Sequence, residues 1–274
     1  MTCIEISDLN FKYEDKELFK NLSLCLQRGK CYVLSGLNGC GKSTLIKIIA
    51  GKLLCTYNKV KVLGEDPFRC TRLSSDIAFL SNDWGTRTVA YSGYNIPIMS
   101  AIKVNEMMVE LRKKYSDRSD ELIDVLGINL NWSLNSISEG QRKRVQLYLG
   151  LLQPFKVCLL DEITVNLDVL VKNRLMKYLK KESMENGACI IYVTHIFDGL
   201  DSWCTDLIYM TRIRNISIIP INEIKQKNIY HYLLENFEKE YDGSIIEQEE
   251  QKDRSVKKNA GGYTNGVLID FKYV

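Results

Sequence analysis

The sequence is short of the residues that bind structural metals, and its cysteines follow no regular pattern. It has only two histidines, and its nine cysteines contain no CxxC pair. These residues complete none of the common zinc-ligand patterns. The cysteines are odd in number and scattered from Cys3 to Cys204, which argues against a disulfide framework. We therefore expect reduced thiols and a protein of the cytoplasm, or also of the nucleus.

An excess of one charge and long apolar runs are also missing. Lysine and arginine number 37 against 34 acidic residues, and the net charge of +3 gives no indication of binding to nucleic acid or to an anionic membrane. There is no run of about eighteen apolar residues, which a membrane span requires, and no signal-peptide pattern at the N-terminus. With 45% apolar residues, the chain can bury a full core. The composition predicts a soluble protein with one main domain.

Short apolar runs alternate with helical patterns along most of the chain. Strands are predicted at 30–35, 59–64, 76–81, 157–161, 188–194 and 206–210. Helices are predicted at 42–50 and over much of 99–152. From about residue 224 the composition turns polar, and residues 247–266 have almost nothing to bury. We therefore expect a main domain at 1–225 and a partly flexible extension at 226–274.

A glycine-rich turn lies between the first of these strands and the first helix. Residues 36–43, GLNGCGKS, match the P-loop pattern, in which backbone N–H groups and a helix N-terminus bind phosphate. Lys42 is expected to reach the β and γ phosphates of ATP, and the Ser43 hydroxyl to ligate Mg²⁺. A chance match in an ordinary glycine turn is the alternative, which the flanking strand and helix disfavour. The residues predicted to contact the nucleotide here are Gly36, Leu37, Asn38, Gly39, Cys40, Gly41, Lys42, Ser43 and Thr44.

Polar side chains also follow two apolar runs downstream, where ligands bind in α/β sheets. Asp161 ends the strand VCLLD and is expected to hold Mg²⁺ through water, and Glu162 to orient or deprotonate the attacking water. His195 follows the strand ACIIYVT and is expected to bond the γ phosphate. An acidic helix cap and a structural histidine are the alternatives. Beside a P-loop, the catalytic interpretation is favoured for Glu162, His195 and Lys42.

One further motif resembles a known family. Ile137-Ser138-Glu139-Gly140-Gln141 is similar to the LSGGQ signature of the ABC ATPase superfamily. The resemblance implies that Ser138, Gly140 and Gln141 contact the γ phosphate of ATP bound by a second copy, so that ATP joins two copies head to tail. Ser138 is also a good helix N-cap, and the two uses are compatible.

The same resemblance assigns two further positions. Tyr13 looks like the aromatic residue that stacks on adenine, although a half-buried strand tyrosine is the alternative. Leu167-Asp168 looks like the end of the loop that crosses the dimer interface.

Three positions depart from the common family pattern. Asn82 and Asp83 stand where a glutamine is expected, and Asn82 is the candidate for the residue that couples the γ phosphate to Mg²⁺. Glu139 replaces a glycine and would weaken dimer closure by like-charge repulsion, unless its side chain points away from ATP. Val165-Asn166 replaces the usual Ser-Ala pair of the crossing loop.

Residues 64–68, 146–170 and 190–203 resemble the soluble, single-cassette I-type ABC proteins, whose fungal members associate with the cytoplasmic deadenylase complex. The resemblance implies an ABC-type P-loop NTPase of the α/β class. Its core sheet is mainly parallel, with an N-terminal antiparallel β part and an α-helical lobe at about 85–155. It also implies an ATPase with further protein subunits as partners in mRNA metabolism. The alternatives are the ATP-hydrolysing subunit of a membrane transporter, and a scaffold that binds ATP but barely turns over.

Overall fold

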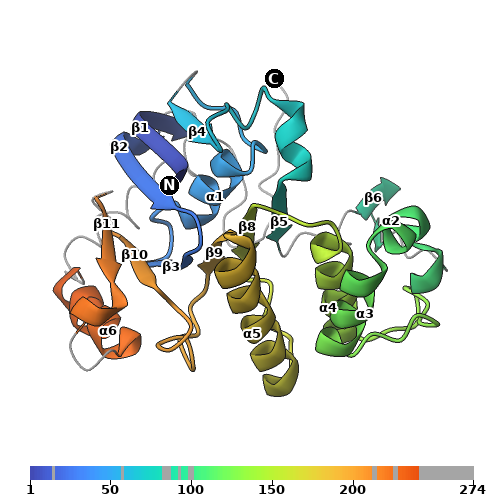
Figure 1. Cartoon of the computed structure of the whole chain (residues 1–274). Coiled ribbons are helices and arrows are strands. Elements are labelled where there is room, and N and C mark those ends of the chain that lie inside the picture. Colours follow the sequence, from blue (N-terminus) through green and yellow to red (C-terminus); the bar gives the residue numbers. More distant parts are fainter. Residues whose placement is uncertain are drawn as a thin grey trace. The chain divides into compact units, whose positions relative to one another are not determined.

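The computed structural model describes residues 1–13, 16–56, 59–81, 88–91, 94–97, 102–211, 215–224 and 228–240 (Figure 1). The chain divides into two units, Met1–Tyr230 and His231–Val274. The first unit contains every sheet and nearly all of the helices, and the helix α6 (Ile229–Glu240) continues into the second. The predicted domain boundary near residue 225 stays a prediction. No helix within the described ranges is long and apolar enough to cross a membrane.

The core of the first unit is a six-stranded sheet in the order β11-β10-β3-β9-β8-β5. All neighbouring strands are parallel except β10 and β11. The strands are β3 (Cys31–Gly36), β5 (Ile77–Ser81), β8 (Val157–Asp161), β9 (Cys189–Val193), β10 (Asp206–Met210) and β11 (Ile216–Pro220). Every residue of β3, β8, β9 and β10 is buried, as expected of strands covered on both faces.

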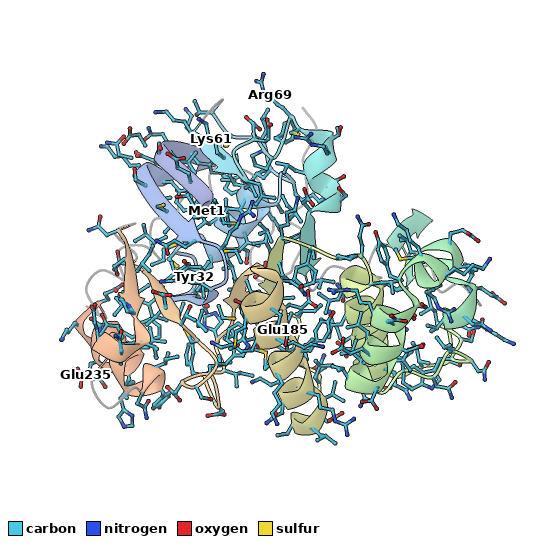
Figure 2. The ribbon with its side chains drawn as sticks, in the orientation of Figure 1. Met1, Tyr32, Lys61, Arg69, Glu185 and Glu235 are labelled. Carbon is cyan, nitrogen blue, oxygen red and sulfur yellow. The ribbon has the colours of Figure 1, made fainter. Side chains whose placement is uncertain are left out.

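A second, antiparallel sheet is built from the N-terminal residues. It has the order β2-β1-β4, with β1 (Thr2–Tyr13), β2 (Lys16–Gln27) and β4 (Val60–Val62). Along β1 buried and exposed positions largely alternate, so one face of the sheet joins the core. The Tyr32 hydroxyl accepts a hydrogen bond of 2.9 Å from the backbone N–H of Gln27, which ties the end of β2 to β3. Figure 2 labels Tyr32 among the interior side chains.

Helices follow or cover the core strands. They are α1 (Lys42–Ile49), α2 (Val109–Lys114), α3 (Ser116–Leu126), α4 (Glu139–Leu151) and α5 (Val169–Asn186), with short 3-10 turns at Thr71–Ser75, Val104–Glu106 and Ile221–Glu223. A buried ion pair joins α3 to α5, with 2.8 Å between Arg118 Nη1 and Glu182 Oε1. The Arg118 guanidinium also donates to the Leu151 carbonyl at 2.8 Å and lies over the rings of Phe155 and Tyr178. Arg118 therefore anchors α3 and α4 on α5.

The predicted fold class is confirmed, and the differences are local. The predicted core strands are present with ends shifted by at most a few residues. The predicted helical lobe begins with an antiparallel hairpin instead, β6 (Thr88–Tyr91) and β7 (Tyr94–Pro97), before its helices start. Strand β11 and helix α6 were not predicted, and residues 241–274 of the predicted flexible extension lie outside the described residues.

Candidate active site

The predicted P-loop connects β3 to α1, and either close packing or a positive φ angle explains each of its three glycines. A Cβ on Gly36 would lie 2.2 Å from the Met210 carbonyl oxygen, and one on Gly41 would lie 2.8 Å from the ring of Phe19. Gly39 and Gly41 also have φ angles of +82° and +107°, a region that other residues rarely adopt. Gly41 is the N-cap of α1 and provides no side-chain cap. The first turn of α1 therefore presents its backbone N–H groups without a capping side chain.

Lys42 points back into this loop. Its Nζ donates hydrogen bonds to the carbonyls of Gly36 at 2.8 Å and Leu37 at 3.1 Å, and the residue is 6% exposed. Burial lowers the Lys42 pKa, against the opposing electrostatic effects of Cys40, Glu162 and Asp161. Cys40 is itself buried, whereas Asn38, Gly39 and Ser43 are exposed. The loop thus has an interior cation and an exposed rim.

Two oxygen ligands meet beside the loop. The Ser43 hydroxyl, from α1, donates a hydrogen bond of 3.2 Å to Asp161 Oδ1 at the end of β8. Asp161 is buried, and Ser43 is exposed. A hydroxyl and a carboxylate are the hard oxygen donors that Mg²⁺ takes in proteins, usually one or two at a time together with water and phosphate. The chemistry of this donor pair therefore fits Mg²⁺.

Glu162 and His195 lie at the ends of neighbouring strands, with 3.3 Å between His195 Nε2 and Glu162 Oε1. Glu162 has a φ of +52°, an uncommon backbone conformation for a non-glycine residue that is typical of functional sites. Its backbone N–H donates to the Val193 carbonyl at 3.1 Å, which fixes the start of the loop. Burial lowers the His195 pKa from its ordinary value, and the nearby Lys42 charge lowers it further, against the effect of Glu162. The lowered pKa favours the neutral form of His195 at physiological pH.

The predicted signature segment forms the N-terminus of α4. Ser138 is its N-cap: the Ser138 hydroxyl accepts from the Gln141 N–H at 3.3 Å, and Gln141 Oε1 accepts from the Ser138 N–H at 2.9 Å. A Cβ on Gly140 would lie 2.9 Å from the Asn166 carbonyl oxygen, so the loop after β8 passes directly against the signature. Asn166 Nδ2 donates a hydrogen bond of 2.6 Å to Glu139 Oε1. The two residues that depart from the family pattern thus contact each other.

Tyr13, Asn82 and Asp83 were also predicted from the sequence, and the structure describes no contact between them and the P-loop, Asp161, Glu162 or His195. Tyr13 packs edge-on against Phe11, with 5.0 Å between ring centroids, and is 47% exposed. Asn82 and Asp83 lie outside the described residues.

Gln146 was not identified from the sequence. It is 3% exposed, and its Nε2 donates a hydrogen bond of 2.7 Å to the carbonyl of Ser81, the residue before Asn82. Its only sequence signal is a polar residue among the apolar residues of a predicted helix.

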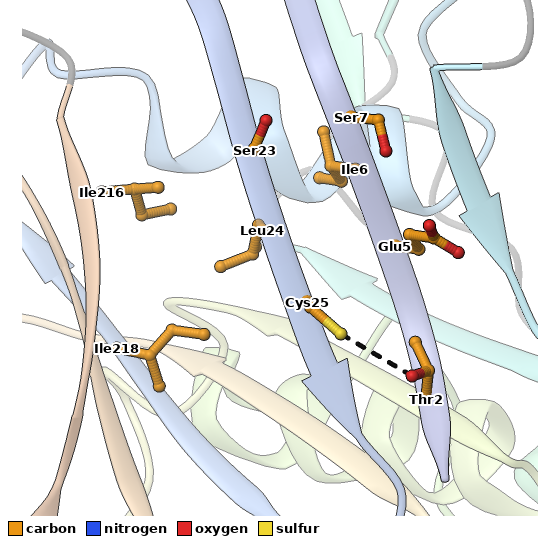
Figure 3. Close-up of a pocket in the computed structure, with 9 residues that line it drawn as sticks. All are labelled: Thr2, Glu5, Ile6, Ser7, Ser23, Leu24, Cys25, Ile216 and Ile218. Carbon is orange, nitrogen blue, oxygen red and sulfur yellow. Dashed lines mark hydrogen bonds between the residues drawn. The ribbon is translucent and has the colours of Figure 1, made fainter.

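A separate pocket of about 580 Å³ lies between the N-terminal sheet and β11 (Figure 3). None of the predicted site residues lines it; it is formed by Thr2, Glu5, Ile6, Ser7, Ser23, Leu24, Cys25, Ile216 and Ile218. The candidate active site is therefore identified by the side chains around the P-loop, and this pocket is not part of it.

Comparison with known proteins agrees with the site and the fold. Residues 19–165 match the family model described as ABC transporter. ABC transporter I family member 20 of Arabidopsis thaliana is 42% identical over 234 residues, which cover 81% of this chain and 71% of that protein. CCR4-associated factor 16 of Saccharomyces cerevisiae is 35% identical over 216 residues, covering 76% of this chain and 75% of that protein.

A solved structure has the same fold. The dimeric ATP-binding cassette MJ0796, solved in a post-hydrolysis state with ADP and phosphate, superposes with a TM-score of 0.62 at 22% identity, over 79% of this chain and 98% of that one. The predicted resemblance to the ABC ATPases, including their I-type members, is confirmed by these relatives. The chain belongs to the ABC transporter family of ATP-binding cassettes and is an ABC-type ATPase that binds and hydrolyses ATP.

Proposed function

We propose that the chain hydrolyses Mg-ATP at a seam between two copies of itself, as a regulatory subunit of a complex in mRNA metabolism. The observation that carries the catalytic part is the 3.3 Å contact between Glu162 and His195. The Glu162 charge also raises the Lys42 pKa against the effect of burial, and the Lys42 charge lowers the His195 pKa. A base, a neutral hydrogen-bond donor and a cation then meet where the phosphates of ATP would lie.

The P-loop residues bind the phosphates in this proposal. Backbone N–H groups from Gly36 to Thr44 face the phosphate oxygens, and the N-terminus of α1 adds its positive partial charge. Lys42 exchanges the carbonyls of Gly36 and Leu37 for the β and γ phosphate oxygens. These bonds are stronger than those to carbonyls, because both partners are charged.

Ser43 and Asp161 are the residues that would hold Mg²⁺, Asp161 through water, with Asn82 as a further candidate contact. When bound, the ion would neutralise negative charge on the phosphate oxygens. Glu162 orients or deprotonates the attacking water, and its constrained backbone keeps the carboxylate at the end of β8. Neutral His195 donates a hydrogen bond to the γ phosphate, and Tyr13 stacks on the adenine.

The second copy completes the site. Ser138, Gly140 and Gln141 lie at the N-terminus of α4, whose positive partial charge suits a γ phosphate bound by a partner. The shared fold with the dimeric cassette MJ0796 supports this arrangement. Loss of the γ phosphate removes the bridge between the two copies, so hydrolysis opens the seam.

The cellular role rests on the relative CCR4-associated factor 16, whose name states an association with CCR4. The alternative is the ATP-hydrolysing subunit of a transporter, in keeping with the family name. Purification of the tagged chain from native cells distinguishes the two. Deadenylase subunits recovered with the chain support the regulatory role, and a membrane-spanning subunit supports the transporter.

Phosphate release from Mg-ATP by the purified chain tests the catalytic part. Glu162→Gln is expected to lower the turnover by about 10²- to 10⁴-fold, because the base is lost, and to leave binding of a fluorescent ATP analogue unchanged. Glu185→Gln removes an exposed carboxylate from α5 (Figure 2) and serves as the matched control with unchanged turnover. Equal turnover in Glu162→Gln and the wild type would overturn the assignment.

A further inference from the structure

The loop at 162–168, which joins β8 to α5, is attached to the signature helix α4 at two points. Asn166 Nδ2 donates a hydrogen bond of 2.6 Å to Oε1 of Glu139, which is the first residue of α4. Arg144, five residues further along α4, forms an ion pair with Asp168, which is also the N-cap of α5. The Asn166 backbone lies so close to Gly140 that a Cβ there would be 2.9 Å from its carbonyl oxygen. The loop and the start of α4 therefore form one contiguous surface.

The other end of the same loop is attached to the core sheet. The Glu162 N–H donates to the Val193 carbonyl at 3.1 Å, and the Thr164 hydroxyl is hydrogen-bonded to the buried hydroxyl of Tyr192. Only Val165 stands between Thr164 and Asn166. Asn166 therefore connects the start of α4 to the short segment that begins at Glu162.

The chemistry of the Glu139–Asn166 contact allows one orientation only. An ionised carboxylate accepts hydrogen bonds and cannot donate, so the Asn166 amide must present its NH₂ group. The bond is charge-assisted and stronger than one between two neutral groups. It also directs the Glu139 carboxylate toward its own chain. A carboxylate held there would repel a phosphate at the signature segment less than one pointing outward.

We propose that Glu139 and Asn166 are a positioning pair for ATP hydrolysis. Asn166 holds the Glu139 carboxylate away from the γ phosphate that the signature segment receives, and Glu139 fixes the loop that carries Glu162. The pair thereby couples contact at the signature to the position of the base within the same chain. This inference rests on the proposed function of both segments, and it gives a role to two residues that depart from the family pattern.

A donor–acceptor swap tests the pair. Asn166→Asp places two carboxylates in contact, and we expect the turnover to fall by about tenfold, the scale of one hydrogen bond lost with added repulsion. The double variant Glu139→Gln, Asn166→Asp reverses donor and acceptor, has the same net charge as the wild type, and is expected to recover most of the turnover. Binding of a fluorescent ATP analogue to the free chain should stay unchanged in both, because the P-loop is untouched.

Matched controls separate this effect from charge and folding. Asn131→Asp adds a carboxylate at another exposed asparagine and should leave the turnover unchanged. Thermal unfolding verifies that each variant folds. Wild-type turnover in Asn166→Asp, or a double variant no better than Asn166→Asp, would overturn the positioning pair alone. If the wild-type chain released no phosphate from Mg-ATP, or if Glu162→Gln left its turnover unchanged, the proposed function would be overturned and this inference with it.

Discussion

His195 Nε2 lies 3.3 Å from Oε1 of Glu162, and this contact joins the ends of the adjacent strands β9 and β8. Both side chains are a little more than one third exposed, at 39% and 38%, so both can reach a substrate without moving the strands. In the proposed mechanism a neutral imidazole donates its single N–H to the γ phosphate. A protonated imidazole would instead pair with the Glu162 carboxylate and draw it away from the attacking water. In the proposed mechanism, the protonation state of His195 therefore affects Glu162 in its role as the base.

We expect protonation of His195 to affect the pH dependence of ATP hydrolysis. The His195 pKa lies below its ordinary value of 6.5, so kcat/KM should be constant above that pH and fall below it as the imidazole is protonated. The same shift makes His195 favour the folded chain above pH 6.5, a contribution lost as the pH falls through the folded-state pKa. His195→Gln keeps a neutral donor and should lose this part of the acidic limb, as measured between about pH 5 and 8. An acidic limb identical in the variant and the wild type would contradict the role.

The Ser43–Asp161 contact predicts the metal dependence. Ser43→Ala removes the proposed magnesium ligand, and the Mg²⁺ concentration needed for half-maximal hydrolysis should rise about tenfold or more. Ser74→Ala removes an exposed hydroxyl outside the site and is the control. Magnesium titrations of ATP hydrolysis measure both, and coinciding curves would exclude Ser43 as a ligand.

Two ion pairs between α3 and α5 provide a stability test. Arg118→Met leaves Glu182, whose side chain is 5% exposed, without its partner, and the free energy of unfolding should fall by about 3–5 kcal/mol. Lys181→Met breaks the neighbouring exposed pair with Glu121, and the expected loss is much smaller than for Arg118→Met, because water screens an exposed ion pair. Urea unfolding of the two variants measures the difference. Equal losses would show that Arg118 does not anchor these helices.

Much of the fold was predictable because β3, β8 and β9 are continuous apolar runs, buried on both faces. The strand β11 was missed because its five residues are half-exposed at the antiparallel edge of the sheet and end at Pro220. The helix α6 was missed because Ile229 and Leu233, its buried apolar residues, stand in a strongly polar stretch. Patterns of burial predict central strands better than edges.

The candidate site shows the same limit. Lys42, Asp161, Glu162 and His195 were identified because each follows or ends a predicted element at the edge where ligands bind. The Glu139–Asn166 pair spans 27 residues, and no local pattern shows that a helix start and a loop meet. Both residues were noted separately, as departures from the family pattern, and only the tertiary structure shows that they contact each other.

The mass of the Glu162→Gln variant in solution, measured by light scattering with and without Mg-ATP, tests the ATP-bridged seam most directly. We predict that Mg-ATP doubles the mass from that of one 31.6 kDa chain, and that Ser138→Arg, which blocks the signature segment, abolishes the doubling while ATP still binds. A variant that binds Mg-ATP and remains a single chain would contradict a site completed by a second copy.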